Sequence, residues 1–165
     1  MPDMLVNLLT LPDEAPGLAR LKDEGVEIFR PLAPDATAVV NWVRQTAGQS
    51  ATDECRVCFS RQPVSCFVAA QDNRLLGYAC YDAIAPNFFG PTAVLESRRG
   101  LGIGRALLLR CLWAQRSQGY AYAIIGGVGP AEFYEKCVGA TLIPGSQPGL
   151  YRHFFAGRLE TEDEG

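Results

Sequence analysis

The 165-residue sequence has little of what several protein classes require. It contains one histidine, His153, and its basic residues do not cluster except at Arg98, Arg99 and Arg105, while the formal net charge is −3. Nucleic-acid binding depends on clustered Lys and Arg, so we exclude nucleic acid as a main partner. The most apolar stretch, Ala106–Ala114, contains an arginine and is too short to cross a bilayer. We therefore expect no membrane partner.

The start of the chain also lacks the features of a secretory leader. Residues Met1–Pro12 contain no Lys or Arg, whereas a leader begins with basic residues and ends at a small-residue cleavage site. We expect a cytoplasmic protein.

The six cysteines do not form a metal-binding pattern in the sequence. Cys55-x-x-Cys58 is a single pair with no second pair to match it, and a structural zinc site needs four ligands. Cys66 and Cys80 fall in strand-like runs and Cys111 in an apolar helix, where a free cysteine behaves as a small buried hydrophobe. We predict reduced structural thiols and no metal, with a cysteine-based metal or redox protein as the last alternative.

The composition and the order of the elements predict one mixed α/β (α+β) domain. Hydrophobic residues make up 48% and charged residues 20%, which is typical of a globular chain. Helices are predicted from Asp35 to about Thr46, from Ile103 to about Gln118 and from Ala131 to about Val138. Gly48–Asp53 is predicted as a loop. The predicted strands are Met4–Leu11, Val26–Arg30, Cys55–Ser60, Val64–Ala70, Leu75–Tyr81, Phe88–Leu95, Tyr120–Ile125, Thr141–Ile143 and Tyr151–Phe155.

One segment carries a recognisable chemistry. A strand ending near Val94 leads into glycines at 100, 102 and 104, and a helix follows at once. Glycine lets the backbone approach a bulky anion, and the first turn of a helix offers unpaired N–H groups with a partial positive charge. We predict that Arg99–Gly104 forms a strand-to-helix turn that grips a pyrophosphate group.

Two common phosphate-binding motifs do not fit this segment. A P-loop needs Lys followed by Ser or Thr at the helix start, but Gly104 is followed by Arg105 and Ala106. The dinucleotide fingerprint needs a different glycine spacing and an acidic residue at the end of the next strand, where this chain has Gly126 and Gly127.

The remaining pattern is Arg99-x-x-Gly102-x-Gly104, followed downstream by the segment Glu132–Lys136, which contains Phe133-Tyr134-Glu135-Lys136. With these motifs the chain resembles the GNAT superfamily of N-acetyltransferases, from about Val26 to Phe155. On this basis we predict an N-terminal extension (1–25) packed on the domain, a GNAT-like acetyltransferase domain (26–157) and an acidic tail (158–165).

The resemblance implies a GNAT-like fold, with a mixed, mostly antiparallel sheet splayed between two central strands and flanked by helices. It also implies acetyl-CoA as cosubstrate, with the pyrophosphate on Leu101–Arg105 and the pantetheine arm between the strands that end near Glu96 and Ile125. Tyr134 matches the family's tyrosine near the sulfur. The cofactor-binding residues implied are Val94, Leu95, Glu96, Arg99, Gly100, Leu101, Gly102, Ile103, Gly104, Arg105 and Tyr134.

Acetyl transfer requires a neutral amine, a stabilised carbonyl oxygen and a proton for the leaving thiolate. Tyr134 is the predicted proton donor. Glu96 is the carboxylate nearest the expected reacting centre and a candidate base, or else a surface carboxylate paired with Arg98. Asp82 is a weaker candidate base and fits a turn residue better. Tyr81 and the pair at 88–89 either line an acceptor pocket or belong to the core.

The predicted function is an N-acetyltransferase that moves an acetyl group to a primary amine of a small molecule or protein by direct attack. The alternative is a catalytically idle module that binds and senses acyl-CoA. A transferase for a longer acyl chain is a further alternative, decided by pocket depth near Cys80 and Ile124. By analogy with the family, the chain is a possible homodimer.

Overall fold

The computed structural model describes residues 1–155 and contains a single seven-stranded sheet. Its strands are β1 (Met4–Asn7), β2 (Glu27–Phe29), β3 (Cys66–Gln71), β4 (Arg74–Tyr81), β5 (Phe88–Val94), β6 (Tyr122–Ile125) and β7 (Thr141–Leu142). Their order across the sheet is β2-β3-β4-β5-β6-β1-β7. Neighbouring strands are antiparallel except β5 and β6, which run parallel. The predicted mixed, mostly antiparallel sheet is confirmed.

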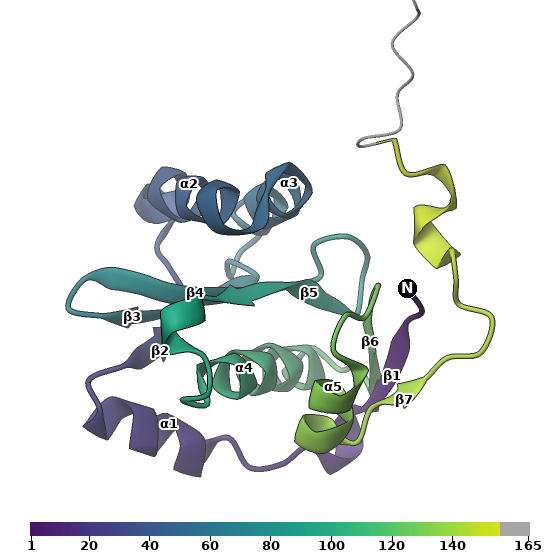
Figure 1. Ribbon diagram of the computed structural model, residues 1–165, viewed down its shortest axis with the longest axis horizontal. Coiled ribbons are helices and arrows are strands. Elements are labelled where there is room, and N and C mark those ends of the chain that lie inside the picture. The colour runs from purple at the N-terminus through teal and green to yellow at the C-terminus, as the bar shows by residue number, and fades with distance from the viewer. Residues whose placement is uncertain (156–165) are drawn as a thin grey trace, which may run out of the picture.

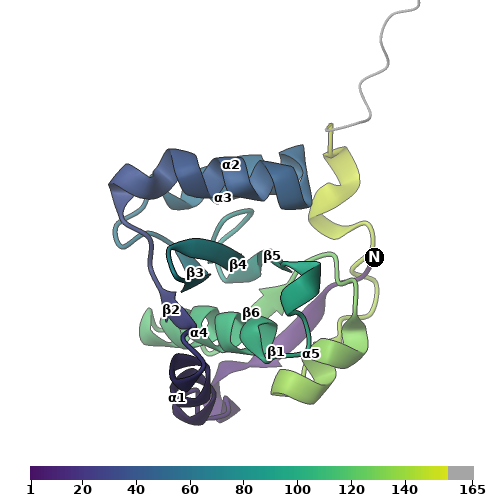
Figure 2. The ribbon, with the colours of Figure 1, turned by 60° about the vertical axis from the view of Figure 1, so that its left-hand side comes forward.

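Helices cover both faces of this sheet (Figures 1 and 2). They are α1 (Ala15–Asp23), α2 (Ala36–Ala47), α3 (Gln49–Cys58), α4 (Ile103–Ser117) and α5 (Ala131–Val138). The pair α2 and α3 lies over one face, and α1, α4 and α5 lie on the other. None of the helices in the described part of the chain combines the length and the apolar character needed to span a membrane.

Each face has its own buried core. The larger core surrounds α4 and includes Leu107, Leu108 and Leu112, which are fully buried. The smaller core lies under α2 and α3, where Val39, Val40 and Val43 pack against β3 and β4; it also holds four of the six cysteines. The helix predicted from Asp35 to about Thr46 is therefore present and buries its three valines.

The two parallel strands separate soon after they meet. β5 pairs with β6 only at Phe88 and Phe89, opposite Ile124 and Ile125. Pro91 then follows in β5, and proline has no N–H to donate to a neighbouring strand. β6 ends at Ile125 and continues as a loop. The predicted splay between two central strands is thus present, and it opens on the side of the sheet where β5 leads into α4.

Two segments differ from their predicted structure. Gly48–Asp53 and Cys55–Ser60 were predicted as loop and strand, but residues 49–58 form α3. The buried residues there are Thr52, Cys55 and Cys58, a spacing of three that is helical. Tyr151–Phe155 is not a strand, because Gly149–His153 forms a 3₁₀ helix.

The N-terminal segment takes part in the sheet. Residues 1–25 were predicted as an extension packed on the domain; within them, β1 lies between β6 and β7 and pairs with both. The tail predicted at 158–165 lies outside the described residues.

Candidate functional site

The glycine segment forms the predicted strand-to-helix turn. After β5 the chain makes a short 3₁₀ turn at Glu96–Arg98 and then enters α4 at Ile103. Gly100 and Gly102 have φ of 81° and 87°, a left-handed conformation that side-chain-bearing residues rarely adopt. The first amides of α4 have no partner inside the helix, so they are available to an anion.

A cavity of about 550 Å³ opens in front of this turn; we call it the loop cavity. It is lined by Phe89, Thr92, Ala93, Val94, Arg98, Arg99, Gly100, Gly102, Ile103, Gly104, Arg105, Leu108, Pro130, Phe133 and Tyr134. Its three arginines are its only charged lining residues among residues 1–155. The loop cavity therefore combines free helix amides with positive side chains and suits an anionic ligand.

Most of the predicted cofactor-binding residues line the loop cavity. Those that line it are Val94, Arg99, Gly100, Gly102, Ile103, Gly104, Arg105 and Tyr134. Leu95, Glu96 and Leu101 do not, and Glu96 and Leu101 are exposed. The ion pair considered for Glu96 with Arg98 is absent from the described residues.

Arginine side chains crowd this turn more than the motif alone indicates. Arg99 Nε donates a hydrogen bond of 3.3 Å to the Val94 carbonyl, so this side chain reaches back along β5. Arg20 from α1 lies directly against Gly102, where any Cβ would collide with its guanidinium. Sequence reasoning did not identify Arg20, because nothing in α1 signals that its end lies beside a loop eighty residues later.

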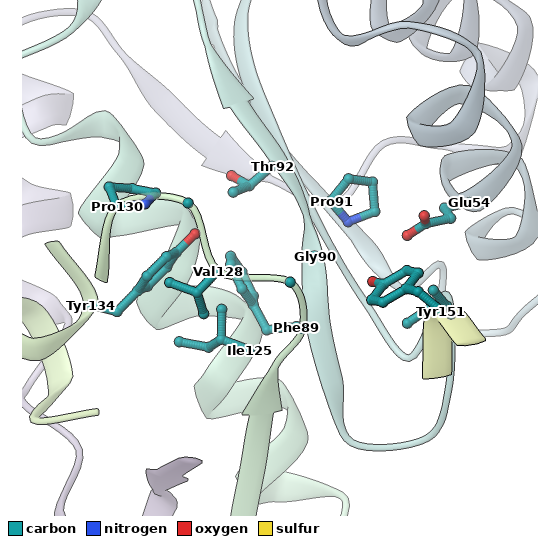
Figure 3. A pocket seen from close by; sticks show the side chains of 14 residues that line it. Glu54, Phe89, Gly90, Pro91, Thr92, Ile125, Val128, Pro130, Tyr134 and Tyr151 are labelled. Carbon is teal, nitrogen blue, oxygen red and sulfur yellow. The ribbon is translucent and has the colours of Figure 1, made fainter. Parts of the chain in front are cut away.

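A second cavity, of about 300 Å³, lies on the other side of the splay; we call it the Glu54 cavity (Figure 3). Its lining residues come from six separate parts of the chain: Glu54, Ile84, Phe89, Gly90, Pro91, Thr92, Ile125, Gly126, Gly127, Val128, Gly129, Pro130, Tyr134 and Tyr151. Figure 3 shows Glu54 and Tyr151 at one end of it and Tyr134 at the other.

Glu54 is the only charged lining residue of the Glu54 cavity among residues 1–155. It projects from α3, it is half-buried, and no salt bridge joins it to another described residue. Burial raises the pKa of this carboxyl above its ordinary value of 4.5. An unpaired carboxylate at the wall of a cavity can hold a cationic ligand or accept a proton.

The loop that closes the Glu54 cavity is held by the N-terminal segment. The Gly127 amide donates to Asp3 Oδ1 at 2.8 Å, and the Val128 amide donates to the Pro2 carbonyl at 2.9 Å. At Gly126 a Cβ would lie 3.0 Å from the Phe88 ring, so a larger residue would displace that ring. These contacts fix the backbone between β6 and α5.

The two cavities share a wall made of Phe89, Thr92, Pro130 and Tyr134. Tyr134 is 6% exposed, and its ring packs edge-on against Phe89 and Phe133, with centroids 6.2 and 5.1 Å away. Burial raises the pKa of Tyr134 to about 12. Its phenol is therefore protonated at neutral pH and faces the junction of the cavities.

The structure places Asp82 and Tyr81 in structural positions, whereas Phe89 of the predicted pair at 88–89 lines both cavities. Asp82 is buried, and its Oδ1 accepts hydrogen bonds from the Asn87 amide at 2.8 Å and from Gln115 Nε2 at 3.2 Å, as expected of a turn residue. Tyr81 is fully buried in the core. Cys80 and Ile124, which were expected to decide acyl-chain length, line neither cavity.

Comparisons with known proteins point to one family. Residues 62–137 match the family model described as an acetyltransferase (GNAT) domain. No curated protein matches the sequence.

Solved structures share the fold. One is a GCN5-related glucosamine N-acetyltransferase region of a fungal multi-domain GH3 beta-N-acetylglucosaminidase, with a TM-score of 0.69 and 14% identity over 86% of this chain and 19% of that one. Another is a GCN5-related N-acetyltransferase from Sphaerobacter thermophilus, with a TM-score of 0.59 and 17% identity over 86% of this chain and 48% of that one. The chain thus spans about a fifth and about half of these two proteins.

Proposed function

We propose that this chain, whose residues 62–137 match the acetyltransferase (GNAT) domain model, transfers an acetyl group from acetyl-CoA to a primary amine by direct attack. The domain supports acetyl transfer in general. The observation that carries the finer proposal is the meeting of two cavities of opposite charge at Tyr134. One suits a polyanionic cofactor, and the other suits a cationic acceptor.

The loop cavity is the proposed cofactor site. The pyrophosphate would bind the first-turn amides of α4 at Ile103–Arg105, with Arg98 and Arg99 beside it. The pantetheine arm would run along the free edge of β5 beyond Phe89, where β6 has turned away. There the Val94 carbonyl would exchange its bond with Arg99 for one with a pantetheine amide.

The Glu54 cavity is the proposed acceptor site. An amine is an ammonium ion at neutral pH, and it must lose a proton before its nitrogen can attack the thioester carbonyl. Glu54 would attract the ammonium and take that proton, directly or through water. The C–N bond then forms, the C–S bond breaks, and the carbonyl oxygen carries negative charge in between.

Because Tyr134 lines both cavities, the leaving sulfur would lie beside its phenol. A phenol with a pKa of about 12 is a weaker acid than a thiol with a pKa of about 8.5. Complete proton transfer from Tyr134 to the thiolate is therefore uphill by roughly 5 kcal/mol. Tyr134 would instead donate a hydrogen bond to the departing sulfur, and the proton that completes the thiol would come from the attacking amine.

Two measurements on the full chain test the proposal. Calorimetric titration with acetyl-CoA should show binding, and release of free CoA thiol should require an amine. We would compare a lysine-containing peptide and glucosamine with an amino acid whose carboxylate adjoins its amine. Because Glu54 repels a nearby carboxylate, the first two should react faster. Binding without thiol release for any amine would support the idle CoA-sensing module instead.

A further inference from the structure

Four cysteines that lie apart in the sequence converge in the smaller core. Cys55 and Cys58 lie on the buried face of α3, Cys66 lies in β3, and Cys80 lies in β4; all four are fully buried. The Sγ atoms of Cys55, Cys66 and Cys80 all lie within 4.8 Å of one another. The CxxC pair, which has no partner pair in the sequence, thus meets two further thiols in space.

The strand register explains part of this convergence. Cys66 and Cys80 are direct cross-strand partners. The Tyr81 amide donates to the Ser65 carbonyl at 3.0 Å, so the adjacent pair, Cys66 and Cys80, is of the non-hydrogen-bonded type. Side chains in such pairs approach each other most closely. Both thiols point to the face that α3 covers.

The helix supplies the other two thiols. Cys55 and Cys58 are three residues apart, so they lie on one face of α3, one above the other. The Cys58 thiol donates a weak hydrogen bond of 3.7 Å to the Glu54 carbonyl, and it would have to give up this bond to bind a metal.

We propose that Cys55, Cys66 and Cys80, with Cys58 as fourth ligand, form a closed zinc site that fastens α3 to the sheet. Zinc binds thiolates at about 2.3 Å in a tetrahedron, which places the sulfur atoms about 3.8 Å apart. The three clustered sulfur atoms need to contract by roughly 1 Å or less to reach that geometry. Each thiol that binds gives up its proton, so zinc uptake releases protons to solvent.

The test begins with the full chain, purified under reducing conditions without chelator and again after chelator treatment. Metal content is measured by mass spectrometry, and the chelated protein is titrated with Zn²⁺ and with Co²⁺, whose absorption reports tetrahedral thiolate coordination. We expect one ion per chain. Alkylation with and without Zn²⁺, mapped by peptide mass spectrometry, should show protection of the four cluster cysteines and no change at Cys137, which lies outside the cluster.

Matched variants separate ligation from folding. Cys66→Ala and Cys80→Ala should lose stoichiometric binding, whereas Cys111→Ala, a buried cysteine of the larger core, should keep it. If Cys66→Ala does not fold, the alkylation map of the unaltered chain decides.

Two results would overturn the proposal. One is no stoichiometric Zn²⁺ or Co²⁺ binding by the unaltered chain. The other is binding that persists in folded Cys66→Ala and Cys80→Ala.

Discussion

The two cavities that meet at Tyr134 differ in how the chain builds them and in the sign of their charge. The loop cavity takes most of its lining from two stretches, 92–94 and 98–105, and it is lined by three arginines and no acid among residues 1–155. The Glu54 cavity takes most of its lining from β5 and the loop after β6, with single residues from α3, from α5 and from the 3₁₀ helix at 149–153. It is lined by one acid and no base within the same range.

The difference separates two tasks. Backbone amides and arginines hold a polyanion wherever its exact contacts fall, and a local motif is sufficient for that. Deprotonating an amine needs a side chain at a defined place, and such a place is assembled from distant elements. The shared wall at Phe89 and Tyr134 is where the two tasks meet.

Removing the negative charge of the Glu54 cavity should have the largest effect. In Glu54→Gln the acceptor amine loses both its attraction and its base, so we expect kcat/KM for a cationic amine to fall about 10³-fold, within the range typical of general-base removal. Affinity for acetyl-CoA should stay unchanged. Initial rates of thiol release and calorimetry measure the two quantities.

One further variant serves as the control for this prediction, and another tests an alternative base. Asp53→Asn removes a carboxylate from the exposed side of α3 and should leave turnover near that of the unaltered chain. Glu96→Gln tests the base predicted from the sequence. If Glu96→Gln is the variant that loses turnover while Glu54→Gln does not, the Glu54 cavity does not hold the base.

Adding a negative charge to the loop cavity should have the next largest effect. A Cβ at Gly104 meets only Phe133 and Val94, each at 3.7 Å, so the turn tolerates a side chain there. For a charge separation of about 5 Å and an effective dielectric constant of 20, the carboxylate of Gly104→Glu would repel a bound pyrophosphate by roughly 3 kcal/mol. We expect about 100-fold weaker acetyl-CoA binding than in Gly104→Gln, which has the same bulk without the charge. Equal affinities in the two variants would show that the cavity does not select anions.

The sequence predicts the turn that forms the loop cavity but does not predict the Glu54 cavity, and the reason is physical. The turn at Arg99–Gly104 is a local backbone requirement, and the glycines that satisfy it are visible side by side. The sheet and α4 were predicted for a similar reason, because their hydrophobic periods are strong. The resemblance to the GNAT superfamily, drawn from Arg99–Gly104 and Glu132–Lys136, is confirmed by the family model and the fold.

Glu54 was missed because its segment was read with the wrong period. Cys55, Val57 and Phe59 alternate with other residues and resemble a strand, whereas burial recurs every three residues along α3. The same error hid the convergence of Cys55 with Cys66 and Cys80, since it depends on α3 lying over that face of the sheet. The roles predicted for Glu96 and Tyr134 stay predictions until they are measured.

Tyr134 belongs to both cavities, and its burial has a measurable consequence at alkaline pH. Because burial raises the pKa of Tyr134 from 10.0 to about 12, the folded protein keeps the phenolic proton that the unfolded chain loses near pH 10. Below pH 10 the phenol is protonated in both states and does not change the free energy of unfolding. Between pH 10 and 12 the unfolded chain loses this proton and the folded protein keeps it, so the free energy of unfolding falls. Relative to Tyr134→Phe, the free energy of unfolding should fall by up to about 3 kcal/mol over that range. Denaturant titrations at successive pH values measure it, and the other tyrosines, present in both proteins, cancel.

The smallest expected effect is that of Tyr134→Phe on turnover at neutral pH. If the phenol donates a hydrogen bond to the departing sulfur, its removal weakens an interaction that becomes strong only as the sulfur gains charge. A bond of that kind contributes about 1.5 kcal/mol, so kcat should fall about tenfold. Neither the dissociation constant of acetyl-CoA nor the KM of the amine should change, because the ring still packs against Phe89 and Phe133. A rise in either constant with kcat unaltered would make Tyr134 a wall between the cavities rather than a donor to the sulfur.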